Sequence, residues 1–165
     1  MNIALDTNLL AYAEGVNDDE RRLAAIAVID SLDPERTFLP VQALGELFVV
    51  LVKRAGRSRA KARDAILQWG DTFPLIESSP DALIRAMDLA ADHQFPMWDA
   101  IITASAAEAG CRLLLSEDLQ DGFTWGGLTV ANPFSAHPHP LLVNALSKHA
   151  RRAGRVDPMI ALRSE

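Results

Sequence analysis

The feature that most constrains the fold is a set of short, fully apolar segments separated by longer segments with helical periodicity. The apolar segments lack the polar alternation of a strand with one face in water, which indicates strands covered on both faces. Strands that alternate with helices in this way predict an α/β fold with a mostly parallel central sheet. The expected strands span residues 3–5, 37–39, 74–76, 112–115 and 128–130, and the expected helices span residues 9–14, 19–32, 41–54, 58–69, 81–93 and 98–109.

Length and composition fit one globular domain with a short appendage. Of the 165 residues, 49% are hydrophobic and 23% are charged, which is enough apolar material for a core without disulfides. The only candidate boundary is the His-Pro-His-Pro segment at residues 137–140, after which the sequence is basic and helical in pattern. We therefore expect a main domain over residues 1–135 and a helical extension over residues 136–165.

The overall charge, taken alone, argues against a nucleic-acid-binding protein. The net charge is −6 and the pI is near 5.2, whereas a domain that binds nucleic acid commonly has a pI above ~9. The acidic residues are unevenly distributed, because residues 141–165 hold five of the 16 Lys and Arg but only two of the 22 Asp and Glu. The inference from net charge therefore stays open.

The single cysteine, Cys111, excludes an intrachain disulfide and a cysteine-based zinc site, and we expect a buried, inert thiol. The N-terminus lacks a basic region followed by an apolar stretch, so no signal peptide is expected. No apolar run approaches the ~18 residues that a membrane span requires. The expected location is the reducing cytoplasm, with no membrane partner.

Two carboxylates directly follow expected strands. Asp6 comes after the first strand, and Asp118 follows the strand at residues 112–115. Parallel strands share their carboxyl edge, where ligands bind in open α/β sheets, so both acids are expected at one rim. Each also has a structural interpretation: Asp6 can cap the following helix, and Asp118 lies in an acid-rich loop that is equally consistent with solvent exposure.

Asp99 lies in the first turn of an expected helix, where an acid complements the helix dipole by about 0.3–1 kcal/mol. On a helical wheel Asp99 shares a face with Ile102 and Thr103, whereas Glu108 lies opposite and marks the solvent side. We therefore expect Asp99 to point inward, where a carboxylate needs a partner.

Glu46 is the most unusual acid, because its helix at residues 41–54 is apolar nearly all round and is expected to be buried. Glu46 lies on one line with Gln42 and Lys53. Either these residues form a thin solvent-exposed stripe on a buried helix, or the rigid helix carries the Glu46 carboxylate into a cleft.

Carboxylates brought together need a counter-charge. Two unit charges 4 Å apart repel by roughly 4 kcal/mol at an effective dielectric of 20, and protonation or a divalent cation relieves this. A donor set of oxygens favours Mg²⁺ or Mn²⁺ over zinc. The four histidines are scattered or late in the chain, and His137 with His139 is the one closely spaced pair.

The motifs resemble, in order and spacing, the PIN domain, and most closely the VapC-type toxins of bacterial toxin–antitoxin pairs. The resemblance covers about residues 1–135 and implies an α/β/α sandwich that gathers three or four acids around one or two Mg²⁺ or Mn²⁺ ions and cleaves RNA. It is carried by Asp6-Thr7-Asn8-Leu9-Leu10, by Glu46, by Trp98-Asp99-Ala100 and by Leu115 to Gly122.

By position, the resemblance implies that Asp6, Glu46, Asp99 and Asp118 are the catalytic, metal-binding acids. Asn8 and Ser116 would support them, and Asp121 would be an additional acid that holds a second ion or only lies nearby. The implied chemistry is metal-assisted hydrolysis of a phosphodiester, with Asp6 and Asp99 as the chief ligands of the first ion.

Basic and aromatic residues are candidate RNA contacts. Six of the 16 Lys and Arg lie between residues 53 and 63, and they form either a solvated helix face or a rim that contacts phosphates. Trp98 is either a base-stacking surface or a core residue, and the sequence favours core packing. The expected RNA contacts are Lys53, Arg54, Arg57 and Arg59.

The resemblance further implies an RNA substrate, a cognate antitoxin protein and a homodimer, for which the apolar helix at residues 41–52 offers an interface. Two other functions fit the fold: a catalytically silent PIN-like module that binds RNA or protein, and a metal-dependent phosphatase. Neither explains an acid such as Glu46 within an apolar helix.

Overall fold

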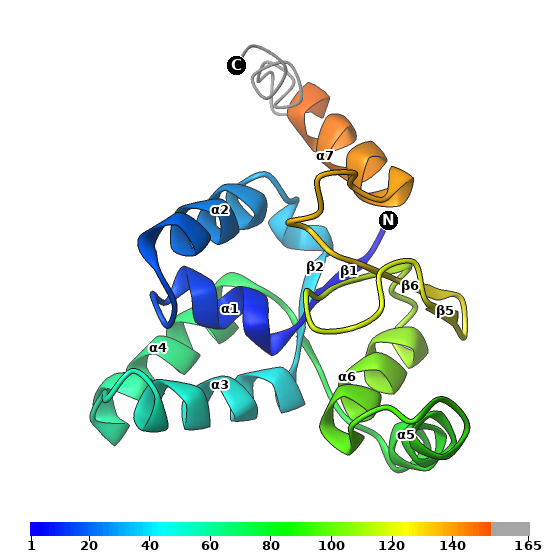
Figure 1. The fold of residues 1–165 in the computed structure, drawn as a ribbon, viewed down its shortest axis with the longest axis horizontal. Helices are drawn as coiled ribbons and strands as arrows, with labels where there is room; N and C mark the ends of the chain where they lie inside the picture. The colour runs from blue at the N-terminus through cyan, green and yellow to red at the C-terminus, as the bar shows by residue number, and fades with distance from the viewer. Residues whose placement is uncertain (153–165) are drawn as a thin grey trace.

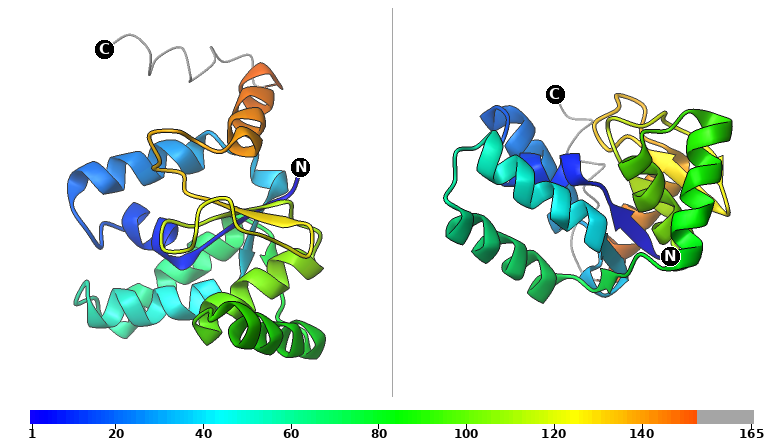
Figure 2. Two further views of the ribbon diagram at one scale, coloured as in Figure 1. Left: turned by 45° about the vertical axis from the view of Figure 1, so that its right-hand side comes forward. Right: turned by 90° about the horizontal axis from the view of Figure 1, so that it is seen from below.

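The computed structural model describes the backbone of residues 1–152 and the side chains of residues 1–147. In this part of the chain a six-stranded sheet in the order β3-β2-β1-β4-β6-β5 lies between two layers of helices (Figures 1 and 2). All neighbouring strands pair in parallel except β5 and β6. The strands are β1 (Ile3–Leu5), β2 (Thr37–Pro40), β3 (Leu75–Ile76), β4 (Leu113–Leu115), β5 (Thr124–Trp125) and β6 (Leu128–Ala131).

The helices divide between the two faces of the sheet. One face packs against α1, α2, α3, α4 and the start of α7, and the other packs against α6, which in turn carries α5. The predicted α/β/α sandwich with a mostly parallel sheet is confirmed. The helices are α1 (Thr7–Ala13), α2 (Asp19–Asp30), α3 (Val41–Lys53), α4 (Arg59–Thr72), α5 (Pro80–His93), α6 (Met97–Glu108) and α7 (Pro140–Arg152), with a 3₁₀ turn at Pro34–Arg36.

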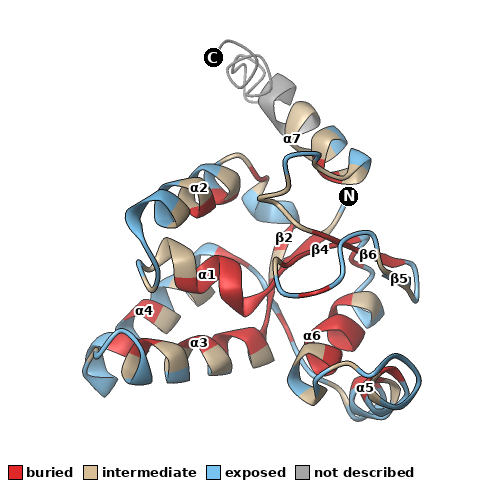
Figure 3. Ribbon diagram, viewed as in Figure 1, coloured by how far each residue is buried: buried red, intermediate tan, exposed pale blue. Residues whose placement is uncertain are grey.

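The central strands are covered on both faces, as their apolar sequences predict. In β4 the side chains of Leu113 and Leu115 join the larger core cluster, whereas Leu114 joins the cluster under α6, and all three are fully buried (Figure 3). Side-chain caps define where several helices begin. For example, the Asp18 and Ser79 side chains accept the N–H groups of Arg21 and Ala82 at the starts of α2 and α5.

The edge strand β5 is absent from the sequence prediction. Its two residues are too few to show periodicity, and the stronger signal is the pair that follows, Gly126 and Gly127. Both glycines have positive φ, 57° and 84°, as a two-residue hairpin turn between antiparallel strands requires.

The sequence suggested that helix α3 is buried on all sides, but the structure shows that one side is exposed. Ala43 and Leu47 are fully buried, but Val41 and Val49 on the opposite side are 38% and 45% exposed. The reason is that only one side of α3 packs on the sheet and α4. The buried thiol is confirmed: Cys111 is 2% exposed, and burial raises its pKa to about 11.

The expected C-terminal extension begins as a helix. In α7 the side chain of Leu142 is 1% exposed and packs into the same core cluster as α1 and α2, so the start of the extension rests on the main domain. Residues 153–165 of the expected extension lie outside the described residues. Among the described helices, none combines the length and the apolar character needed to cross a bilayer.

Candidate active site

The site begins where β1 ends. The backbone N–H of Asp6 donates to the Leu115 carbonyl (3.0 Å), and one Asp6 carboxylate oxygen, Oδ1, accepts the N–H of Thr7 (2.7 Å). Asp6 is therefore the N-cap of α1 and also lies at the carboxyl edge of the sheet. The sequence left open whether Asp6 lies at the rim of the sheet or caps the following helix, and in the structure it does both.

The second oxygen of Asp6 is held from the neighbouring strand. Ser116 follows β4, which pairs with β1, and its hydroxyl donates to Asp6 Oδ2 (2.6 Å). The Asn8 amide donates to the same oxygen (3.1 Å) and to Ser116 Oγ (3.2 Å). All three side chains are buried, and Asp6 is only 4% exposed. The structure therefore brings the predicted supporting residues Asn8 and Ser116 together on Asp6.

Glu46 faces the same corner from α3. Its carboxylate accepts hydrogen bonds from the Gln42 amide (Oε1, 3.2 Å) and from the Thr7 hydroxyl (Oε2, 3.4 Å), and it is half-buried. Glu46 is thus neither fully buried nor a plain solvent residue. It is turned toward the start of α1 and held one helical turn from Gln42.

Asp99 approaches the other acids from the first turn of α6. It is half-buried, and Glu108 at the far end of the helix is exposed, as the helical wheel predicts. Burial, together with the charges of Glu46 and Asp118, raises the pKa of Asp99 to about 6. The acids of α3, α6 and the loop after β4 therefore share one electrostatic environment.

Asp6 is the most strongly perturbed acid. Burial raises its pKa to about 7, hydrogen bonds from Ser116 and Thr7 oppose that rise, and the charges of Asp99 and Glu46 add to it. Asp6 and Asp99 are therefore partly protonated near neutral pH unless a cation compensates their charge.

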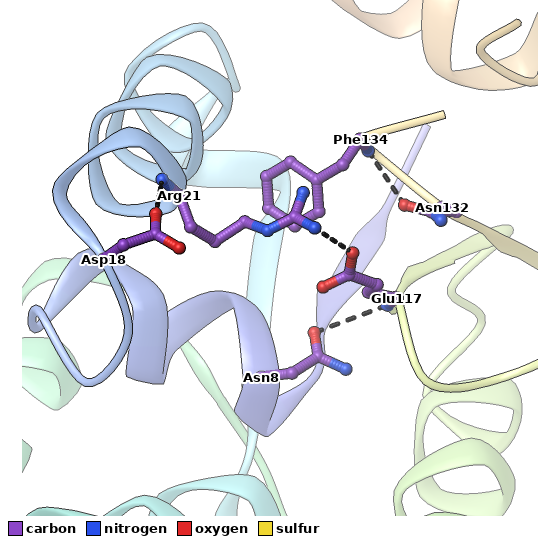
Figure 4. A network of polar contacts seen from close by, with 6 residues as sticks. All are labelled: Asn8, Asp18, Arg21, Glu117, Asn132 and Phe134. Atoms are coloured by element: carbon purple, nitrogen blue, oxygen red, sulfur yellow. Dashed lines mark hydrogen bonds and ion pairs between the residues drawn. The ribbon is translucent and has the colours of Figure 1, made fainter. Parts of the chain in front are cut away.

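The loop after β4 contains three acids with different surroundings. Glu117 forms an ion pair with Arg21 (2.6 Å), shown in Figure 4, and Asp121 accepts the N–H of Asn132 (2.9 Å). Asp118 is exposed, and no hydrogen bond or ion pair to it is found within the described part of the chain. Of the three, Asp118 is the acid available to a ligand, whereas Asp121 anchors the loop to the segment after β6.

A family model for the PIN domain matches residues 3–120, which include all four acids. The chain belongs to the PIN domain family. No curated protein matches this PIN domain in sequence.

Three solved structures with the same fold are a toxin and two toxin–antitoxin complexes. VapC20 of Mycobacterium tuberculosis, a toxin that cleaves the sarcin-ricin loop, aligns with a TM-score of 0.60 at 21% identity, over 71% of this chain and 92% of VapC20. A toxin–antitoxin complex from Klebsiella pneumoniae aligns with a TM-score of 0.60 at 22% identity, over 81% of this chain and 99% of that one. VapBC2 from Rickettsia felis, bound to a promoter DNA fragment, aligns with a TM-score of 0.58 at 14% identity, covering 79% and 97%. At these identities the likeness establishes a common fold.

The donor chemistry of the PIN domain's acids suits a hard divalent cation. The four acids offer only carboxylate oxygens, and no Lys, Arg or His of the described residues forms an ion pair with them. In this part of the chain, no group of three or more His, Cys, Asp or Glu side chains is already arranged to hold a metal ion. His139 Nδ1 accepts the N–H of Leu141 (3.2 Å), so this ring nitrogen caps the start of α7.

The predicted RNA contacts fall into two groups. Lys53, Arg54 and Arg59 are exposed around the turn between α3 and α4. Arg57 is half-buried, because its guanidinium binds both the carboxylate and the backbone carbonyl of Glu14, at 2.5 and 2.6 Å. Arg57 therefore joins this turn to the end of α1. This structural role is enough to explain the arginine, whether or not the protein binds RNA.

The expected core packing of Trp98 is wrong. Its side chain is 57% exposed, because it lies on the outer side of the first turn of α6, while Ala100 and Ile101 face the core. The sequence prediction does not include Arg21, which pairs with Glu117 near the acids. It also does not include the two aromatic residues that pack on Arg21, Tyr12 and Phe134. No local pattern marks them, since they come together only through the fold.

Proposed function

We propose that this PIN domain is a Mg²⁺- or Mn²⁺-dependent endoribonuclease and the toxin of a toxin–antitoxin pair. The observation that carries the proposal is that Asp6, Glu46, Asp99 and Asp118, from four separate segments, lie near enough to feel one another's charges, without an ion pair to a basic residue among the described residues. Four mutually repelling carboxylates reduce stability unless they serve a ligand, and clustered acids with raised pKa values are typical of functional sites. Family membership and the toxins among the solved structures support the same activity.

The four acids have distinct tasks in this proposal. Asp6 is the fixed ligand, because Ser116, Asn8 and Thr7 hold both of its oxygens in place. Asp99 and Asp118 close the site from the opposite side, and Glu46 ligates the ion directly or orients the attacking water through hydrogen bonds. A bound divalent ion supplies Lewis-acid stabilisation of the charge that develops on the phosphodiester.

The RNA lies along the exposed side of the site. Lys53, Arg54 and Arg59 neutralise backbone phosphates, and Lys53 is on the same helix as Glu46. The exposed ring of Trp98, adjacent to Asp99, offers a surface on which a base can stack. These contacts position the strand and leave its cleavage to the acids.

The biological partner in this proposal is an antitoxin protein, and the protein acts as a homodimer in the cytoplasm. The exposed Val41 and Val49 on α3 provide apolar surface for one of these contacts. Co-expression with the product of the neighbouring reading frame, followed by growth rescue, tests the toxin role.

The deciding experiment is cleavage of labelled single-stranded RNA with Mn²⁺ and with EDTA. We expect EDTA to abolish cleavage, and Asp6→Asn and Asp99→Asn to reduce kcat by roughly a thousandfold, since a metal ligand supplies several kcal/mol of transition-state stabilisation. Asp92→Asn, at an exposed site on α5, is the control and keeps full activity.

Three results separate the alternatives. Cleavage that is insensitive to EDTA and to both substitutions contradicts the proposal. RNA binding without cleavage in any metal identifies a silent module. Hydrolysis of p-nitrophenyl phosphate without RNA cleavage identifies a phosphatase.

A further inference from the structure

Beside the four acids, an ion pair joins two segments that are far apart in the sequence. The Arg21 guanidinium on α2 lies 2.6 Å from the Glu117 carboxylate in the loop after β4 (Figure 4). The side chains of Arg21 and Glu117 are 34% and 21% exposed, so the pair is more enclosed than the fully surface-exposed pair of Arg63 and Asp64. An enclosed pair holds its geometry better than a mobile surface pair.

Arg21 is fixed by its surroundings. Its guanidinium carbon lies 4.7 Å from the centre of the Phe134 ring and 5.6 Å from that of Tyr12, and the two rings meet edge to face. The backbone N–H of Phe134 donates to the Asn132 side chain (2.9 Å), which anchors the far side of this cradle. A planar cation held between aromatic rings is a rigid support for a carboxylate.

Glu117 connects this support to the acids. Its backbone N–H faces the Asn8 side-chain oxygen (3.5 Å), and burial and the Glu117 carboxylate together raise the pKa of Tyr12. The residue after it is Asp118, and the next N–H, that of Leu119, donates to Ser116 Oγ (3.3 Å). Asp118 therefore lies between two tethered residues, although its own side chain is exposed.

We propose that Arg21 is a positioning residue that, by binding Glu117, places Asp118 beside Asp6, Glu46 and Asp99. Glu117 and Asp118 are adjacent in the sequence. Because Arg21 binds the Glu117 carboxylate, the Asp118 carboxylate is the one that stays available to a divalent cation. Without Arg21, Glu117 becomes an uncompensated charge next to the cluster, and the loop that carries Asp118 loses one of its tethers. This inference rests on the proposed nuclease function, but its effect on the loop is measurable without RNA.

The experiment compares Arg21→Met with Arg22→Met, the same change at the next, exposed residue of α2. Hydrogen–deuterium exchange of the metal-free protein reports on residues 116–121. Calorimetric titration with Mn²⁺ alone reports on the acids, and RNA cleavage gives kcat and KM. We expect Arg21→Met to speed exchange in this loop and to lower Mn²⁺ affinity and kcat by about 10-fold, with KM for RNA unchanged. Arg22→Met changes none of these.

Two further variants test the route of the effect. Arg21→Lys keeps the cation and recovers part of kcat. Glu117→Gln combined with Arg21→Met is no worse than the more damaging single change, because two residues that act through one contact are not additive. Fully additive losses in the double variant overturn the proposal.

Other outcomes also overturn it. Loop exchange that is identical in Arg21→Met and Arg22→Met removes the positioning role, and a raised KM at constant kcat makes Arg21 an RNA contact instead. If the wild-type protein does not cleave RNA while Arg21→Met still loosens the loop and weakens Mn²⁺ binding, the positioning role is supported and the nuclease function fails.

Discussion

The two sides of the acidic site are built differently. On the inner side, Asp6 is 4% exposed and both of its oxygens accept hydrogen bonds from Thr7, Asn8 and Ser116. On the outer side, Asp99 is half-buried and Asp118 is exposed, and no hydrogen bond to either carboxylate is found among the described side chains. The fold therefore fixes the position of the Asp6 carboxylate by hydrogen bonds and leaves the carboxylates of Asp99 and Asp118 free of such bonds to other described residues.

The difference follows from where each acid is attached. Asp6 and Ser116 follow paired central strands, so the backbone ladder sets their separation. Asp99 begins a helix and Asp118 lies in a loop, and neither is part of that ladder. In the proposed function, one rigid and several adjustable carboxylates would let the site accept a cation and release it without unfolding the sheet.

Removing the support of the inner side is expected to have the largest effect among substitutions that leave the four acids intact. Ser116→Ala deletes the 2.6 Å hydrogen bond to Asp6 and the acceptor for Leu119. We expect a 10–100-fold loss of kcat and of Mn²⁺ affinity, the usual effect of losing a group that orients a ligand. Because that hydrogen bond lowers the pKa of Asp6, the acid limb of the pH–rate profile also moves to higher pH.

Ser135→Ala, in the loop before α7, is the matched control and leaves both quantities unchanged. Wild-type kinetics in Ser116→Ala would mean that the inner side is no more important than the outer one.

The buried charge of Asp6 is expected to make the metal-free protein less stable at higher pH. The pKa of Asp6 is raised from 3.8 to about 7 in the folded state, so the folded protein binds this proton more tightly than the unfolded chain. The resulting stability is complete below about pH 4 and is lost as the pH rises to about 7. Asp6→Asn removes this dependence.

Thermal unfolding in EDTA measures the effect. We expect Asp6→Asn to raise the Tm above that of the wild type by about 9 °C more at pH 8 than at pH 4.5, which corresponds to about 3 kcal/mol. Adding Mn²⁺ at pH 8 raises the Tm of the wild type and not that of the variant. A Tm difference that is constant with pH would show that Asp6 ionises as freely as an exposed acid.

The strand pattern of the sequence predicts one acid on each side of the site. Parallel strands share an edge, so Asp6 and the loop that carries Asp118 are expected at one rim from the strand pattern alone, whereas the roles of Asn8 and Ser116 followed only from the family resemblance. The apolar pattern of the central strands likewise predicts the layers. Both inferences depend on backbone geometry, which short sequence patterns encode.

Contacts between distant side chains are not predictable in this way. The sequence cannot show that Arg21 meets Glu117, or that Arg57 meets Glu14, because such pairs depend on how helices dock. The expected burial of all sides of α3 and of Trp98 was also wrong, since hydrophobicity alone does not show which apolar side chains face solvent. The sequence of β5 is too short to carry a pattern.

The smallest expected effect separates the two kinds of basic residue around the turn between α3 and α4. Replacing Lys53, Arg54 and Arg59 together by Gln leaves Tm nearly unchanged, because all three are exposed. It lowers the salt dependence of RNA binding, with the slope of log K against log salt falling by about 0.7 for each phosphate that is no longer neutralised. Arg57→Gln does the reverse: Tm falls, because Glu14 loses its cationic partner and keeps only the Trp69 N–H, and the slope stays the same. Fluorescence anisotropy of a labelled single-stranded RNA over a series of salt concentrations, with EDTA present to prevent cleavage, measures the slope. A reduced slope in Arg57→Gln would mean that this arginine leaves Glu14 for RNA, and the division between structural and RNA-binding cations would then fail.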